Sequence, residues 1–221
     1  MTDDEPRPLP EVLARIGVSA VPYVGSPLLV LLDEVLTRRR AAASKLMSEI
    51  TAVAGGQENL TLRLANPEIE ALFIDGFETA MRTSITAKQK LLAEVIAQAL
   101  LDDAKVDASQ LYVMALRDLE APHIRALARL ARIVEELRSQ LPSDVLQRPR
   151  FVDRANEQVR GVWNAEPAPV QAALVRTGCV QFSRGPVISS HKIDEHITDF
   201  GFGLLDDIER HGWTDQDGRG E

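Results

Sequence analysis

The sequence has few of the residues on which many small proteins depend for stability or chemistry. Its single cysteine, Cys179, cannot form an internal disulfide, and such sparing use of cysteine is typical of a reducing, cytoplasmic setting. Aromatic residues make up only 5% of the chain, whereas leucine and alanine are abundant, so the composition favours helices over sheets. The net charge of −8 argues against a chain wholly devoted to binding nucleic acid or anionic lipid.

Motifs that carry chemistry are also missing. The sequence has no phosphate-binding loop, dinucleotide fingerprint, nucleophile elbow or paired-cysteine zinc motif. His191 and His196 lie close to Asp194 and Glu195, but their odd offset on a strand would point the two imidazoles to opposite faces, which favours a solvated surface over a metal site. No carboxylate pair stands out as general acid and base. We therefore expect a protein that is not an enzyme and needs no cofactor or metal.

Long apolar runs are scarce as well. The uncharged stretch 16–32 only just reaches the length of a membrane-spanning helix, and Gly17, Pro22, Gly25 and Pro27 interrupt it. Residues 1–10 are acidic and proline-rich, unlike a secretory signal. We expect a buried turn that leads into a core helix, in a cytoplasmic protein. A membrane-active effector that works through residues 16–32 is the second alternative function.

What the sequence does contain is helical periodicity, strongest from Glu68 to Leu101. Two amphipathic helices are predicted there, the first opened by Asn66 as N-cap and Pro67 in the first turn. Their inner positions recur at helical spacing: Ile69, Leu72, Phe73, Gly76, Phe77, Ala80 and Met81 in the first, and Leu91, Leu92, Val95, Ile96, Ala99 and Leu100 in the second. We expect Phe73, Phe77, Val95 and Ile96 to be buried together at the centre of a core.

The rest of the amino-terminal half is predicted to complete a helical domain over residues 1–118, with a disordered tail over 1–8. A long helix from Pro27 towards Ala54 should end at Gly55-Gly56. Residues 57–65 are interpreted as a polar loop with extended character, because Leu60, Leu62 and Leu64 alternate. Asp107, followed by Gln110, indicates a capping box for a helix that ends at residue 118.

The carboxyl-terminal half has a different order of elements. Helices are predicted over 120–142, 151–163 and 167–176, then extended segments over 179–182 and 187–197, then a helix that Thr198 caps. This order over residues 119–211 resembles a winged-helix domain with a small β-hairpin wing, followed by a flexible tail over 212–221. The phrase "ITDFGFGLL" is similar to the helix after the wing, where a glycine lets helix and strand approach closely.

In a DNA-binding winged helix, residues 167–176 would enter the major groove and the wing would touch backbone phosphate. The candidate DNA-binding residues are then Gln171, Arg176, Arg184 and Lys192. From 147 to 192 seven basic residues stand against three acidic ones, a local excess that permits DNA binding. The remaining positions of the recognition helix are alanine, valine, leucine and proline, which read bases poorly. A winged helix that serves protein contacts is at least as well supported.

A wider resemblance covers residues 67–205. "EALFIDGFETAMRTSITAKQKLLAEVIAQALLDD", "LRDLEAPHIRALARLA" and "ITDFGFGLL" resemble, in that order, the layout of the abortive-infection alpha family, bacterial proteins often carried by prophages. The resemblance implies a role in phage defence and supplies no catalytic residues. Our main prediction is a non-enzymatic helical interaction protein of this prophage or phage-defence type, and a homodimer. A winged-helix transcriptional regulator that binds DNA is the first alternative.

Overall fold

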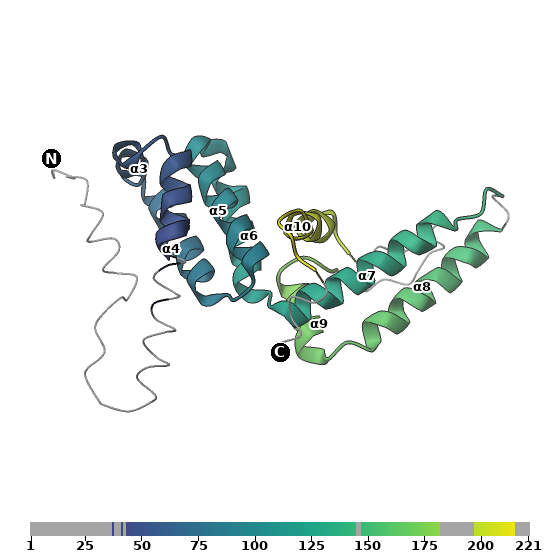
Figure 1. Ribbon diagram of the computed structural model, residues 1–221. Helices are drawn as coiled ribbons and strands as arrows, with labels where there is room; N and C mark the ends of the chain where they lie inside the picture. Colours follow the sequence, from purple (N-terminus) through teal and green to yellow (C-terminus); the bar gives the residue numbers. More distant parts are fainter. Residues whose placement is uncertain (1–36, 38–40, 42, 145–146, 182–196, 215–221) are drawn as a thin grey trace, which may run out of the picture. The chain divides into compact units, whose positions relative to one another are not determined.

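A computed structural model describes residues 37, 41, 43–144, 147–181 and 197–214 of the 221-residue chain. The expected mainly helical class is confirmed (Figure 1). The chain divides into two compact units, and the boundary between them falls after Val113, within a helix. The domain boundary predicted after residue 118 lies at the end of that same helix. Each unit has a core of its own and is described by itself.

The amino-terminal unit contains α3 (Gln57–Arg63), α4 (Pro67–Arg82), α5 (Thr86–Leu101), a 3-10 turn (Asp103–Lys105) and the start of α6 (Val106–Asp118). The Asn66 side chain accepts a hydrogen bond from the Glu68 amide, as expected of the N-cap of α4. Helices α4 and α5 pack against each other along their lengths (Figure 1). Phe73, Phe77, Val95 and Ile96 are all buried, which confirms the predicted core.

One prediction for this unit is wrong, because residues 57–63 form helix α3 rather than a loop with extended character. The preceding helix ends at residue 53, and Gly55 and Gly56 turn the chain with positive φ, as expected. Leu60 and Leu64, four residues apart, are buried on one side of the chain, while Leu62 is exposed. The alternation of leucines therefore does not indicate a strand: Leu60 and Leu64 lie on the buried side of a helix, and Leu62 lies on its exposed side.

The predicted capping box of α6 is also wrong, because α6 begins at Val106 and Asp107 lies within its first turn. The 3-10 turn ahead of α6 is capped by Asp102, which accepts a hydrogen bond from the Ala104 amide at 3.1 Å. The end of α5 is held from α3, since Arg63 Nε donates to the Leu100 carbonyl at 2.6 Å and Arg63 Nη2 to Asp103 at 2.7 Å. A cation at a helix C-terminus also opposes the partial negative charge of the helix dipole.

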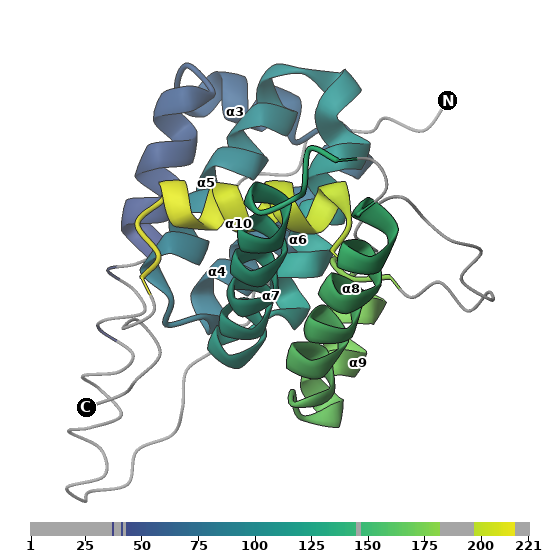
Figure 2. The same ribbon diagram turned by 90° about the vertical axis from the view of Figure 1, so that its right-hand side faces the viewer.

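The carboxyl-terminal unit is built on α7 (Ala121–Ser139), which packs against α8 (Arg148–Asn164), α9 (Ala168–Arg176) and α10 (Asp199–Arg210). Helices α7 and α8 lie side by side in both views (Figures 1 and 2). The predicted start of α7 is confirmed: Pro122 lies in its first turn, and the Glu120 amide donates to His123 Nδ1 at 2.8 Å. The inner face of α7 is apolar and fully buried at Ile124, Leu127, Leu130 and Val134.

The start of helix α10 packs closely against residues 179–180, which follow α9. Val180 and Ile197 form an antiparallel β-bridge. Thr198 caps α10, as predicted, by accepting from the Gly201 amide at 3.0 Å. A Cβ on Gly201 would lie 2.2 Å from the Cys179 carbonyl oxygen, so glycine is required for this close approach of α10 to the backbone at Cys179. The predicted wing itself, with residues 182–196, lies outside the described residues.

Several other predictions fall wholly or partly outside the described ranges. Residues 1–8 and 16–32 are among them. The flexible tail predicted over 212–221 begins too early, because Trp213 is buried and its amide donates to the Ile208 carbonyl at 3.2 Å. Within the part of the chain that the structure describes, no helix is both long enough and apolar enough to cross a membrane.

Candidate interaction surface on helix α9

Helix α9 is apolar on two opposite sides. Its inner side buries Val170, Ala173 and Leu174. Its outer side exposes Ala168, Ala172 and Val175, which recur at offsets of four and three residues and so form one stripe. Val175 is 42% exposed. We call these three residues the α9 stripe. A helix that is apolar all round is normally buried, so the α9 stripe is the unusual surface of this unit.

Gln171, the first candidate base-reading residue, has its amide nitrogen engaged within the fold. Nε2 donates to the carbonyl oxygens of Trp163 and Glu166, each at 2.9 Å, and the residue is half-buried. These bonds satisfy carbonyls at the end of α8 and in the turn that follows it. A glutamine that reads adenine uses this same amide group, so Gln171 would have to break both bonds to contact a base.

Arg176, the second candidate, is exposed and paired at the surface. Its Nε donates to Asp118 Oδ2 at 3.0 Å, and the side chains are 65% and 30% exposed. The pair joins the end of α9 to the end of α6 and neutralises the one cation of α9. Arg184 and Lys192, the other two candidates, lie outside the described residues. The structure therefore places two of the four candidates, and both have partners within the chain.

A buried carboxylate fixes the start of α9. Glu166 precedes the helix, its side chain is 7% exposed, and it accepts two hydrogen bonds from Arg129 of α7, at 2.9 Å from Nε and 2.8 Å from Nη2. Such a two-pronged guanidinium–carboxylate pair defines an orientation as well as a distance. The contact holds the first turn of α9, and with it the α9 stripe, in a defined position.

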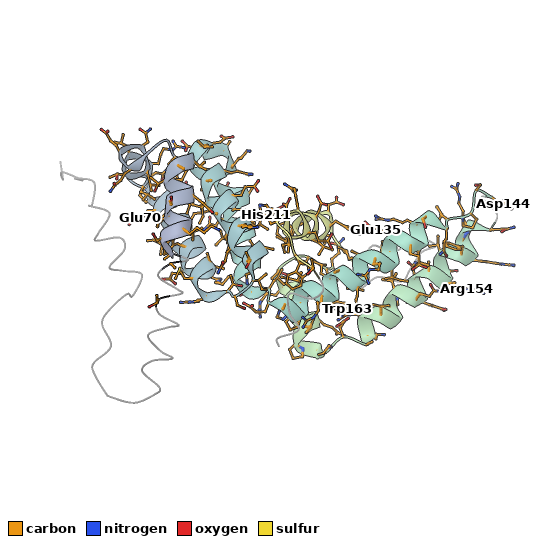
Figure 3. All side chains as sticks on the ribbon, in the orientation of Figure 1. Glu70, Glu135, Asp144, Arg154, Trp163 and His211 are labelled. Atoms are coloured by element: carbon orange, nitrogen blue, oxygen red, sulfur yellow. The ribbon has the colours of Figure 1, made fainter. Side chains whose placement is uncertain are left out.

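The arginines of α8 do not form a basic surface. Arg150, Arg154 and Arg160 are exposed, but Asp153 and Glu157 are exposed on the same helix. Arg154 projects from the outer side of α8, away from α7, whereas Trp163 lies at the α9 end of the helix (Figure 3). Mixed charge of this kind is an ordinary solvated helix face.

Cys179 is a small residue in the core of the carboxyl-terminal unit. Cys179 is fully buried, and desolvation by burial raises the pKa of its thiol, an effect that a hydrogen bond with Thr177 partly opposes. A thiol held in its neutral form is a poor nucleophile. Among the residues described, no three histidine, cysteine, aspartate or glutamate side chains gather where they could hold a metal ion.

Comparisons with known proteins found no match from which the role of helix α9 could be inferred. No family model matches the chain, and no curated protein and no solved structure matches it either. Sequence reasoning missed the α9 stripe, although the spacing of Ala168, Ala172 and Val175 is visible in the sequence. The signal was the presence of apolar residues on every side of a short helix, which was interpreted only as poor base recognition.

Proposed function

We propose that this chain is a non-enzymatic interaction protein of the cytoplasm, and that the α9 stripe is its contact surface. The observation that carries the proposal is the exposure of Ala168, Ala172 and Val175 on a helix whose opposite side is already buried in the core. When a partner removes apolar side chains from water, the free energy falls by about 25 cal/mol per Å² of apolar surface buried. The fold holds the stripe in place through Gln171 and Arg129, so little ordering is required for binding.

We propose a second copy of the chain as the partner, in a homodimer. A chain of net charge −8 repels its own copies, and this repulsion is smallest where the surface carries no net charge. The α9 stripe has no ionisable side chain, and Arg176 beside it is neutralised by Asp118. Two alanines on the stripe also let a helix from the other copy approach closely. A two-fold axis through the stripe would give the self-complementary contact that most dimers use.

The sequence resemblance to the abortive-infection alpha family supports a prophage or phage-defence setting for this interaction. The test at the level of the cell is the plating efficiency of phages on bacteria that produce the chain. Wild-type chain should lower the efficiency for at least one phage, and Val175→Glu should restore it. Equal plating on cells with and without the chain, across a broad phage panel, would argue against the defence role.

A winged-helix DNA-binding regulator is the alternative function. It is supported by the order α7, α8, α9, bridge, α10, since the pairing of Val180 with Ile197 is what the base of a wing requires. It is opposed by the engagement of Gln171 and Arg176 within the fold. Titration of a labelled random duplex at low salt should give no binding. Binding that weakens steeply with salt, and that weakens further when Arg176 and Arg184 are neutralised, would favour this alternative.

Sedimentation equilibrium tests the proposed dimer. Val175→Glu introduces a charge into the α9 stripe, so two copies would bury like charges against each other at a two-fold contact. We expect wild-type chain to be dimeric at micromolar concentration and Val175→Glu to be monomeric. Gln158→Glu is the matched control, because it adds the same charge at an exposed position of α8 and should leave the dimer intact. A wild-type monomer, or equal effects of the two variants, would contradict the proposal.

A further inference from the structure

Asp118, at the end of α6, pairs with two arginines. Its Oδ2 accepts a hydrogen bond from Arg176 Nε at 3.0 Å, and its Oδ1 lies 3.9 Å from Nε of Arg117, the residue before it. Among the described residues, Asp118 is the one carboxylate that pairs with Arg176. The charge of Arg176 is therefore balanced by a single side chain, which comes from another helix.

Arg176 lies at the edge of the α9 stripe. It follows Ala172 by four residues, the spacing of neighbours on one face of a helix, and it follows Val175 directly. It is also the only ionisable side chain of α9. A second copy that covers the stripe must therefore lie against Arg176 as well, and must remove part of its surface from water.

The same ion pair has different consequences in the free chain and in the dimer. In the free chain the side chains of Arg176 and Asp118 are 65% and 30% exposed, so the pair contributes little to stability because water solvates either partner alone. At a covered contact, an unpaired guanidinium would lose water without gaining a carboxylate, which is unfavourable. A two-fold contact would apply this penalty twice, once for each copy.

We propose that Asp118 controls the dimer contact. By pairing with Arg176 it removes an unbalanced charge from the edge of the α9 stripe, and so lets two copies meet there. This inference rests on the proposed homodimer and assigns to it a residue outside α9. Asp118 acts through the charge of Arg176 and not through the position of α9, because Arg129 and Glu166 already fix the start of that helix.

Sedimentation equilibrium of the full chain and three variants tests this role. Asp118→Asn leaves Arg176 without its carboxylate. It also reduces the negative net charge, so bulk repulsion alone would make the dimer tighter, opposite to the local effect. Asp118→Asn with Arg176→Gln removes both charges of the pair. Arg117→Gln is the control, because it removes the other arginine beside Asp118 and leaves the Arg176 pair in place.

We expect Asp118→Asn to raise the dissociation constant of the dimer about tenfold or more. The double variant should return it to within about threefold of the wild-type value, because no unpaired charge remains at the stripe. Arg117→Gln should change it less than about twofold. The Tm of the carboxyl-terminal unit should be nearly the same in all the variants, since each change affects only an exposed ion pair.

Three results would overturn the inference, and they are distinguishable. A dimeric wild type with an equal dissociation constant for Asp118→Asn would remove the role of Asp118 and leave the α9 contact in place. A double variant as weak as Asp118→Asn would show that the ion pair positions α9 and does not act by neutralising Arg176. A monomeric wild type would overturn the proposed dimer and this inference together.

Discussion

Replacement of Gly201 by alanine tests the closest contact in the carboxyl-terminal unit. A Cβ at this position would lie 2.2 Å from the Cys179 carbonyl oxygen, 2.9 Å from its carbonyl carbon and 3.0 Å from its Cα. All three atoms belong to the backbone, so no side-chain rotation can relieve the overlap. Helix α10 and the backbone at Cys179 must instead move apart. This movement is opposed by the hydrogen bond that the Thr198 amide donates to the Cys179 carbonyl at 3.0 Å and by the Val180–Ile197 bridge.

The expected cost follows from two opposed terms. Overpacking of a well-packed site costs about 1–3 kcal/mol, and a backbone clash with little room to relax belongs at or above the upper end of that range. Alanine returns about 1 kcal/mol through its higher helix propensity. We therefore expect Gly201→Ala to lower the free energy of unfolding by about 2 kcal/mol. For a unit of this size, that corresponds to a fall in Tm of about 10 °C.

Tryptophan fluorescence isolates this effect, because both tryptophans of the chain, Trp163 and Trp213, are buried in the carboxyl-terminal unit. Gly161→Ala in α8 is the control, since a Cβ there meets nothing within 4 Å. It should raise the stability by about 0.5–1 kcal/mol. A Tm for Gly201→Ala equal to that of the wild type would refute the reasoning and show that α10 is not held against Cys179.

Two further predictions concern groups that are buried in this unit. Arg129→Ala should destabilise it by about 2 kcal/mol, because the Glu166 carboxylate, 7% exposed, loses its guanidinium partner. Glu166→Gln should lower the stability less, because the Arg129 side chain is half exposed and water can solvate it. Urea unfolding measures the stability of the two variants. A larger loss in Glu166→Gln than in Arg129→Ala would contradict this account. Cys179 should react with a thiol reagent at pH 8 far more slowly in folded than in unfolded chain, because burial raises the pKa of its thiol and blocks access. Rapid labelling of the folded chain would show that this thiol is accessible.

The helices that sequence reasoning predicted best are those whose signals are local. Asn66 and Pro67 start α4 by their own chemistry, and the spacing of Phe73 and Phe77 defines its inner face whatever lies against it. The glycine of "ITDFGFGLL" was likewise expected to permit a close approach, and Gly201 does so.

The predictions that failed depended on contacts between residues far apart in the chain. Leu60 and Leu64 fit a strand and a helix equally well in sequence, and only their burial in the folded unit decides for α3. Asp107 was expected to cap a helix, but the helix begins before it, at Val106, directly after a 3-10 turn that Asp102 caps. The partners of Gln171 and Arg176, at the end of α8 and in α6, could not be predicted because the sequence does not specify side-chain directions at a turn.

Disulfide cross-linking tests the proposed role of the α9 stripe most directly. Cys179 is the only cysteine and is buried, so Ala172→Cys places a single accessible thiol on the stripe. Gln158→Cys places one on the exposed face of α8 as the control. Under mild oxidation, the account predicts rapid formation of a covalent dimer by Ala172→Cys and little by Gln158→Cys. Equal rates for the two variants, or no dimer with either, would contradict a contact between copies through α9.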